Sequence, residues 1–121
     1  MSSLTLRAPA KLNLSLRVLG RRDDGFHEID TLMVKLPELA DLIEFNESPN
    51  GFTFECDDRS LPTDETNLVV KAVRAYDAVS GISCGFQIKL TKNIPHGAGL
   101  GGGSSDAATT LIGLDRLNDN R

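Results

Sequence analysis

The residues best suited to chemistry lie in a glycine-dense loop, residues 97–103. Five of the chain's 11 glycines fall there, namely Gly97, Gly99, Gly101, Gly102 and Gly103. Glycine lets the backbone adopt positive φ and approach a ligand with no Cβ in the way. Consecutive exposed N–H groups then form a concave site for anions, and a helix that follows directs its positive end to the same place. The loop therefore predicts a cradle for phosphate.

Two serines follow the loop at the expected start of a helix. The hydroxyls of Ser104 and Ser105 can bond a phosphate, or reach a magnesium ion carried with it. The structural alternative is a flexible loop in which Ser104 is an ordinary helix N-cap. Five glycines in a short loop cost considerable conformational entropy, which favours the binding interpretation.

Two other phosphate motifs do not fit the loop. A P-loop requires Gly-Lys-Ser/Thr at the helix start, but Gly103 precedes Ser104 here. Gly97, Gly99 and Gly102 satisfy G-x-G-x-x-G, yet a dinucleotide fold places the first glycine directly after a strand. A stretch that contains Pro95 separates this loop from the preceding strand, so we reject that interpretation.

A lysine and an asparagine near the N-terminus form a second candidate site. Lys11 and Asn13 are two residues apart in an alternating segment, so their side chains share one face of the expected strand. An ammonium and an amide presented together suit a substrate hydroxyl beside phosphate charge. Taken alone, the pair is more typical of the solvent face of a half-buried strand than of a site.

Three longer strings occur in order along the chain, with a shorter one between them. They read APAKLNL at 8–14, GRRDDGFHE at 20–28, TNLV at 66–69 and PHGAGLGGGSSDAA at 95–108. Together they resemble the motifs of the GHMP kinases, and the last resembles the family's ATP-binding motif in its triple-glycine version. Phe26 stands where the family usually has tyrosine, so ring stacking is retained while a hydroxyl contact is lost.

The resemblance implies a role for each matching residue. Lys11 would be catalytic, positioning and activating the attacking hydroxyl, and Asn13, Phe26 and His27 would bind a substrate that carries cytidine diphosphate. Asn67 would lie beside the adenine pocket, although it could equally be a helix cap. Ser104 would also contact the metal. The implied ATP-binding residues are Asn67, Pro95, Gly97, Gly99, Leu100, Gly101, Gly102, Gly103, Ser104 and Ser105.

The implied activity is ATP- and Mg²⁺-dependent phosphorylation of a hydroxyl on the methylerythritol part of that substrate, in isoprenoid precursor synthesis. The family's catalytic aspartate and much of its substrate wall come from later segments that residues 1–121 do not match. The chain is therefore expected to be the N-terminal ATP-binding domain, binding ATP weakly and inactive alone. Two alternatives stay open: another GHMP substrate such as homoserine or a mevalonate, or a non-catalytic nucleotide-binding module.

Composition and charge narrow the classes of protein and of ligand that remain. The 121 residues carry a net charge of −4, which argues against a general nucleic-acid binder. The basic residues of segment 1–22 are nevertheless unaccompanied by acids, which suits a small anionic ligand: Arg7, Lys11, Arg17, Arg21 and Arg22. No apolar run is long enough to cross a membrane. Cys56 and Cys84 lack metal-ligand spacing, so free thiols in the cytoplasm are expected. The sequence does not indicate an oligomeric state.

These residues must be positioned by a mixture of strands and helices. Alternation predicts strands at 4–8, 11–19 and 27–36, the first two split by a turn at Pro9, and a probable hairpin of 41–45 with 51–56. A strand at 85–90 and helices at 66–80 and about 104–117 follow. Their order indicates an α+β domain. The resemblance implies helices on one side of a mixed sheet and a left-handed β-α-β crossover.

Each of the two predicted helices has one apolar face, which we expect to be buried. Helical spacing places Val69, Ala72, Val73, Tyr76 and Val79 on one face of the first helix, and Ala107, Ala108, Leu111, Leu114 and Leu117 on one face of the second.

Overall fold

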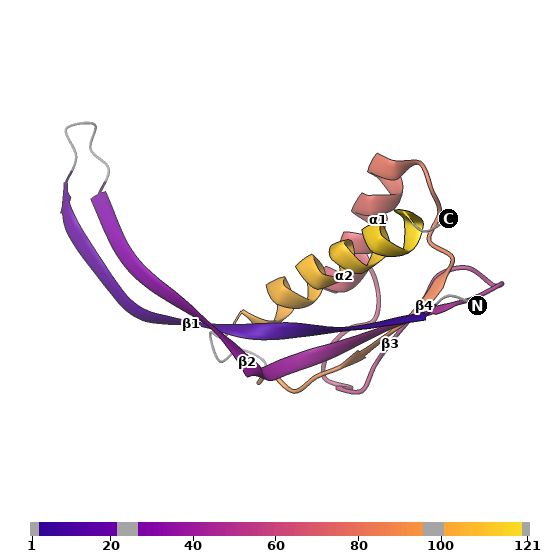
Figure 1. Ribbon diagram of the computed structural model, residues 1–121, viewed down its shortest axis with the longest axis horizontal. Coiled ribbons are helices and arrows are strands. Elements are labelled where there is room, and N and C mark those ends of the chain that lie inside the picture. The colour runs from indigo at the N-terminus through magenta and orange to yellow at the C-terminus, as the bar shows by residue number, and fades with distance from the viewer. Residues whose placement is uncertain (1–2, 22–26, 96–100, 120–121) are drawn as a thin grey trace.

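A computed structural model describes residues 3–21, 27–95 and 101–119, with the backbone alone for 12–21, 27–35 and Pro37. Its elements are β1 (Ser3–Arg21), β2 (His27–Glu47), β3 (Thr53–Cys56), α1 (Leu68–Ser80), β4 (Phe86–Thr91) and α2 (Gly102–Asp119). The strands form one mixed sheet in the order β1-β2-β4-β3, and both helices cover the same face of it (Figure 1). The α+β class and the one-sided placement of the helices are confirmed.

The first two strands form a long antiparallel ribbon. The predicted turn at Pro9 is wrong, because β1 continues through Pro9 and pairs with β2 from Ser3 to Arg21. Proline has no N–H to donate, and the register shift between Pro9 and Ala10 accommodates it. The segments predicted at 27–36 and 41–45 likewise join into the single strand β2.

The hairpin predicted between 41–45 and 51–56 is also wrong. A turn does follow β2, with Gly51 at φ +85°. However, β4 lies between the two segments, antiparallel to β2 and parallel to β3. Phe86, Ile88 and Leu90 of β4 are all buried, and a strand with such an apolar face is stabilised most in the centre of the sheet. The local turn therefore does not decide which strands pair.

Helix α1 joins the parallel strands β3 and β4, which makes a β-α-β crossover. The left-handedness of this crossover stays a prediction. Gly81 ends α1 in the left-handed conformation, as expected from its position. Val69, Ala72 and Val73 are buried as predicted, but Val79 is 91% exposed. The C-terminal end of α1 rises away from the sheet, so its last turn has no strand beneath it (Figure 1).

Helix α2 buries a face different from the predicted one. Leu114 and Leu117 are buried as expected, whereas Ala108 is exposed and Leu111 is 39% exposed. The buried face is instead rich in small and polar residues: Ser105, Asp106, Thr109, Thr110 and Gly113. An apolar stripe was the wrong criterion here, because Asp106 accepts from Lys92 and the Thr110 hydroxyl donates to the carbonyl of Asp106.

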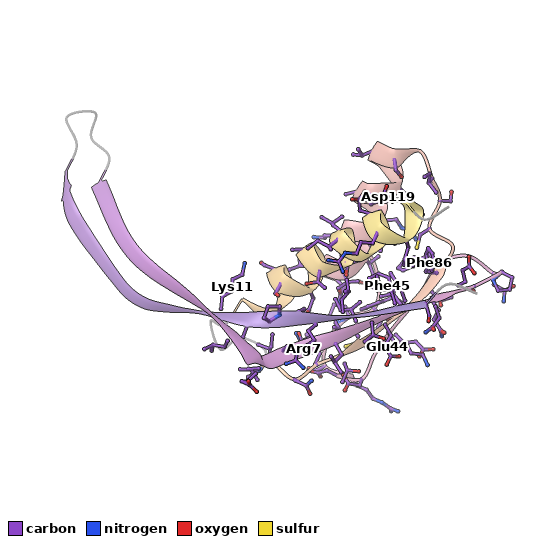
Figure 2. The ribbon with its side chains drawn as sticks, in the orientation of Figure 1. Arg7, Lys11, Glu44, Phe45, Phe86 and Asp119 are labelled. Carbon is purple, nitrogen blue, oxygen red and sulfur yellow. The ribbon has the colours of Figure 1, made fainter. Side chains whose placement is uncertain are left out.

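A close approach between α2 and β2 completes the core. A Cβ at Gly113 would lie 2.4 Å from Cζ of Phe45, so the ring fills the space that a side chain would need. Phe45 and Phe86 lie between the sheet and the helices (Figure 2). Within the described ranges, neither helix combines the length and hydropathy that a membrane span requires.

Candidate functional site

The start of α2 is the centre of the candidate site. Gly101 has φ +68°, a conformation that costs a residue with a Cβ roughly 1 kcal/mol or more. Its carbonyl accepts the first helical hydrogen bond, from the N–H of Ser105 at 2.9 Å. Gly101 therefore occupies the cap position, and it has no side chain with which to cap the helix. No side chain among the described residues caps this helix, so the N–H groups of its first turn can bind another acceptor.

The next two glycines lie close to neighbouring side chains. A Cβ at Gly102 would lie 3.1 Å from Cγ2 of Ile94 and 3.3 Å from Nζ of Lys92. One at Gly103 would lie 3.1 Å from Cδ1 of Leu68. The first turn of α2 is thus held close to its neighbours, so part of the glycine density serves the fold as well as any ligand.

The two serines lie in different environments. Ser104 is exposed within the first turn of α2, and the helix begins two residues before it. The alternative in which Ser104 is the N-cap is therefore wrong. Ser105 is only 6% exposed and faces the interior. Ser104 is the hydroxyl that a phosphate or a metal ion can reach from solvent.

Lys11 lies beside this turn. It is half-buried on β1, and its Cβ is 3.9 Å from the position that a Cβ of Gly101 would occupy. Figure 2 shows Lys11 on the side of β1 that carries α2. The pairing of β1 with β2 is regular from Ala10 to Asn13, so Asn13 follows two positions along the same strand. The structure thus brings the lysine and the glycine turn together; the Asn13 side chain lies outside the described residues.

Asn67 is the N-cap of α1. Its Oδ1 accepts the N–H of Val69 at 2.8 Å, and its Nδ2 donates to the carbonyl of Pro62 at 2.9 Å. The helix-cap alternative is therefore confirmed, and a contact with ATP stays a prediction. Pro95 is exposed next to the buried Ile94, which packs on Gly102.

Most of the remaining predicted residues are not described by the structure. Phe26, Gly97, Gly99 and Leu100 lie outside the described residues, and so does the side chain of His27. His27 begins β2, and this end of the β1–β2 ribbon stands away from the helices (Figure 1). The backbone of His27 and the turn at Gly101 therefore lie in separate parts of the described chain.

A buried ionic cluster beneath the turn was missed by sequence reasoning. Nζ of Lys92 lies 2.6 Å from Oδ2 of Asp41 and 2.9 Å from Oδ2 of Asp106. Asp41 also accepts the backbone N–H groups of Asn93 and Ile94, at 2.7 and 2.8 Å. One signal was available, because Asp41 alternates in phase with the core residues Ile43 and Phe45. A carboxylate in a core position requires a partner.

The two carboxylates of the cluster differ in acidity. Burial raises the pKa of Asp41, but hydrogen bonds from Asp106, Lys92 and two backbone N–H groups outweigh it and leave that pKa lowered. Burial, and then the neighbouring Asp41, raises the pKa of Asp106 to about 8. Burial also lowers the pKa of Lys92, yet its two carboxylate partners raise it overall. At neutral pH the cluster is thus a Lys92–Asp41 ion pair beside a protonated Asp106.

The described residues offer little to a metal ion. They contain no group of three or more histidine, cysteine or acidic side chains that could hold one. Asp106 is committed to Lys92, so the exposed hydroxyl of Ser104 is the available donor at the turn. These residues fit a Mg²⁺ ion that arrives with a phosphate ligand, and they do not fit a metal held by the protein alone.

Comparison with known proteins agrees with this arrangement. The family model for the GHMP kinases N terminal domain matches residues 67–121, which include α1 and the glycine turn. The 4-diphosphocytidyl-2-C-methyl-D-erythritol kinase of Chlorobaculum parvum is 47% identical over 97% of this chain.

The chain belongs to the GHMP kinase family.

Solved GHMP kinase structures have the same fold. A crystal structure of 4-(cytidine 5'-diphospho)-2C-methyl-D-erythritol kinase superposes with a TM-score of 0.75 and 40% identity, over 94% of this chain and 40% of that one. Homoserine kinase from Cytophaga hutchinsonii gives 0.73 at 28% identity, over 100% of this chain and 37% of that one. The chain spans 40% of the length of the Chlorobaculum parvum relative.

Proposed function

We propose that residues 1–121 form the N-terminal, ATP-binding domain of a 4-diphosphocytidyl-2-C-methyl-D-erythritol kinase. The observation that carries this proposal is the uncapped glycine turn at Gly101 with Lys11 beside it. The 47% identity to the Chlorobaculum parvum relative, which extends over 97% of the chain, supports this substrate. The whole protein would phosphorylate a hydroxyl of the methylerythritol part in the non-mevalonate route to isoprenoids.

The phosphate end of ATP would be bound by the start of α2. The N–H groups after Gly101 supply donors, and the helix dipole favours the negative charge of the phosphates. Ser104 adds an exposed hydroxyl and would contact a Mg²⁺ ion that enters with ATP. Proposed partners in this binding are Asn67, Pro95, Gly97, Gly99, Leu100, Gly102, Gly103 and Ser105.

Lys11 would act on the acceptor hydroxyl. Phosphoryl transfer forms a bond from the hydroxyl oxygen to the γ-phosphorus and breaks the bond to the bridging oxygen, so that ADP leaves. An ammonium beside the turn stabilises the charge that collects on the transferred group and orients the hydroxyl. Asn13, Phe26 and His27 would hold the cytidine end of the substrate. We assign the base that takes the hydroxyl proton to no residue of 1–121.

This chain alone is expected to bind ATP weakly and not to turn over. The described free thiols, Cys56 and Cys84, fit a reducing cytoplasm, where we place the reaction.

The test is a turnover assay on a protein completed to the length of the relatives. With ATP, Mg²⁺ and 4-diphosphocytidyl-2-C-methyl-D-erythritol, ADP and the phosphorylated substrate should appear in equal amounts by mass spectrometry. Lys11→Met should reduce turnover by roughly 100-fold or more, while the exposed Lys89→Met should not.

Homoserine is the alternative acceptor, favoured by the TM-score of 0.73 with a homoserine kinase. Phosphorylation of homoserine in preference to the cytidine substrate would replace the proposal. ATP binding without transfer to either acceptor would favour the non-catalytic module.

A further inference from the structure

Three charged side chains from three parts of the chain meet beneath the first turn of α2. Asp41 comes from β2, Lys92 follows β4 and Asp106 comes from α2 itself. Their side chains are 0%, 7% and 3% exposed respectively. Nζ of Lys92 is also 3.3 Å from the position that a Cβ of Gly102 would occupy. The ammonium is therefore in contact range of both the helix start and the acid four residues along it.

The partners of Lys92 are unequal. Asp41 fixes the segment after β4, because it accepts from Lys92 and from the N–H groups of Asn93 and Ile94. Asp106 has Lys92 as its side-chain donor, and its Oδ1 is buried without a partner among the described residues. One side of the cluster is thus firmly attached to the sheet. The other side connects α2 to that anchor through the Lys92 ammonium and through the hydrogen bond between Asp106 and Asp41.

Stability alone is a weak reason for such a cluster. Removing three ionisable groups from water costs several kcal/mol per ion, and well-packed apolar residues often stabilise a core as well or better. The ionic arrangement does have one property that apolar packing lacks. Its hydrogen bonds have fixed lengths and directions, so it determines where the first turn of α2 lies relative to β2.

We propose that Lys92 is a positioning residue for the nucleotide phosphates. Held by Asp41, it fixes Asp106 and the backbone at Gly102, so that the N–H groups of the turn are preorganised for an anion. Lys92 acts through the turn and does not touch the nucleotide. The inference rests on the proposed ATP-binding function, and it assigns the geometry of that site to a residue outside the glycine loop.

The experiment compares ATP with adenosine, which lacks the phosphates. Dissociation constants for both are measured by calorimetry on a protein completed to the length of the relatives, with Mg²⁺ present. Wild type, Lys92→Met and Lys89→Met are compared. Lys89 is the matched control, because it undergoes the same substitution on β4 and is exposed. Thermal unfolding of each variant establishes that it is folded at the temperature of the measurement.

We expect Lys92→Met to lose roughly 10- to 100-fold in affinity for ATP, the value of a hydrogen bond or two to a charged group. Its affinity for adenosine should change less than about twofold, and Lys89→Met should match wild type for both ligands. A merely stabilising role would leave the ratio of the two affinities unchanged in folded protein. A folded Lys92→Met with the wild-type ratio overturns the inference.

A substitute variant and the wild-type affinities complete the test. If Lys92→Met does not fold, Asp106→Leu replaces it, since leucine roughly keeps the volume of the side chain and removes the acceptor for Lys92. That variant should show a smaller fall in the same ratio, and an unchanged ratio overturns the inference. Wild-type protein that binds ATP no more tightly than adenosine would contradict the proposed function itself, and the inference with it.

Discussion

The two helices of this chain begin in opposite ways. Helix α1 begins at a side-chain cap, where Asn67 accepts the N–H of Val69. Helix α2 begins at Gly101, which has no side chain, and among the described residues no side chain accepts from the N–H groups of its first turn. An N-terminus satisfied by its own cap is structural. One without a described side-chain cap, beside a lysine, has N–H groups that can bind an anion, as we propose for α2.

The first turns of the two helices also differ in the side chains that lie beneath them. Under α1 the first turn buries Val69 and Val70, which are apolar. Under α2 lies the ionic cluster of Asp41, Lys92 and Asp106. Apolar packing tolerates small shifts in position, whereas hydrogen-bonded ions do not. The helix that we propose to bind the phosphates therefore has the more precisely fixed support.

The largest expected effect is on the pH dependence of stability. Burial and the neighbouring Asp41 raise the pKa of Asp106 in the folded chain to about 8, from an ordinary value of 3.8. Between these values the folded chain keeps a proton that the unfolded chain has lost. The free energy of unfolding should therefore fall from about pH 4 to about pH 8, by up to ~1.4 kcal/mol per pH unit. The stabilisation is fully present below pH 4 and lost above 8.

Urea unfolding of this chain at pH 5, 6, 7 and 8 measures that slope. The lowered pKa of Asp41 acts below pH 4 and the raised pKa of Lys92 acts above about 10, so neither contributes in this window. Asp106→Asn should flatten the curve. Because the histidines remain in both proteins, the difference between the curves isolates Asp106. Identical slopes in the two proteins would contradict the raised pKa.

A matched pair of glycines sharpens the contrast between a helix end that binds and one that does not. Gly101 and Gly81 have φ of +68° and +73°, and an added Cβ meets no clash at either. Gly101→Ala and Gly81→Ala should each lower stability by about 1 kcal/mol. Only Gly101→Ala should also weaken ATP binding, by roughly tenfold. Equal ATP affinities in the two folded variants would show that the turn at Gly101 is not a phosphate site.

Two substitutions at the start of α1 separate capping from nucleotide contact. Asn67→Ala should destabilise the chain by about 1 kcal/mol, whereas Asn67→Asp keeps a good cap and should lose less. The proposed ATP contact predicts that both variants bind ATP more weakly. Denaturant unfolding and ATP titration are measured together. If Asn67→Asp binds ATP like wild type, the residue is a cap alone.

The smallest expected effect is at Ser104. Because its side chain is exposed in the first turn of α2, Ser104→Ala should change stability by less than about 0.5 kcal/mol. Loss of one hydroxyl contact should weaken ATP by several-fold. The exposed Ser60, in a loop distant in sequence from α2, provides a control as Ser60→Ala. Equal ATP affinities of the two variants would remove Ser104 from the site.

Local signals in the sequence predicted the local features well. Gly81 ended α1 where expected, and the glycine string correctly indicated a turn before α2. Features that depend on distant partners were missed. The turn near Gly51 predicted a hairpin, but β4, much later in the chain, takes the place between the two segments. No local pattern encodes that insertion.

In the candidate site, too, residues within local sequence strings were singled out, whereas a contact between distant residues was missed. Lys11 and Gly101 were found because strings of neighbouring residues carry them. The link from Asp41 through Lys92 to Asp106 escaped because its members are far apart in sequence and read singly as ordinary surface charges. Alternation placed Asp41 in phase with Ile43 and Phe45, and this was the one usable clue. Predicting its partner requires knowing which strands are neighbours.

The position of β4 between β2 and β3 also constrains the order in which the chain can fold. The β1–β2 ribbon joins segments adjacent in sequence, so it can form early. Among the described strands β3 pairs with β4 alone. It can therefore join the sheet only after Phe86–Thr91 has been synthesised and α1 has crossed over, which brings β4 beside β3. Until then its edge and the apolar face of β2 are unprotected. The Lys92–Asp41 contact joins the segment after β4 to β2, so it requires that these two strands be neighbours.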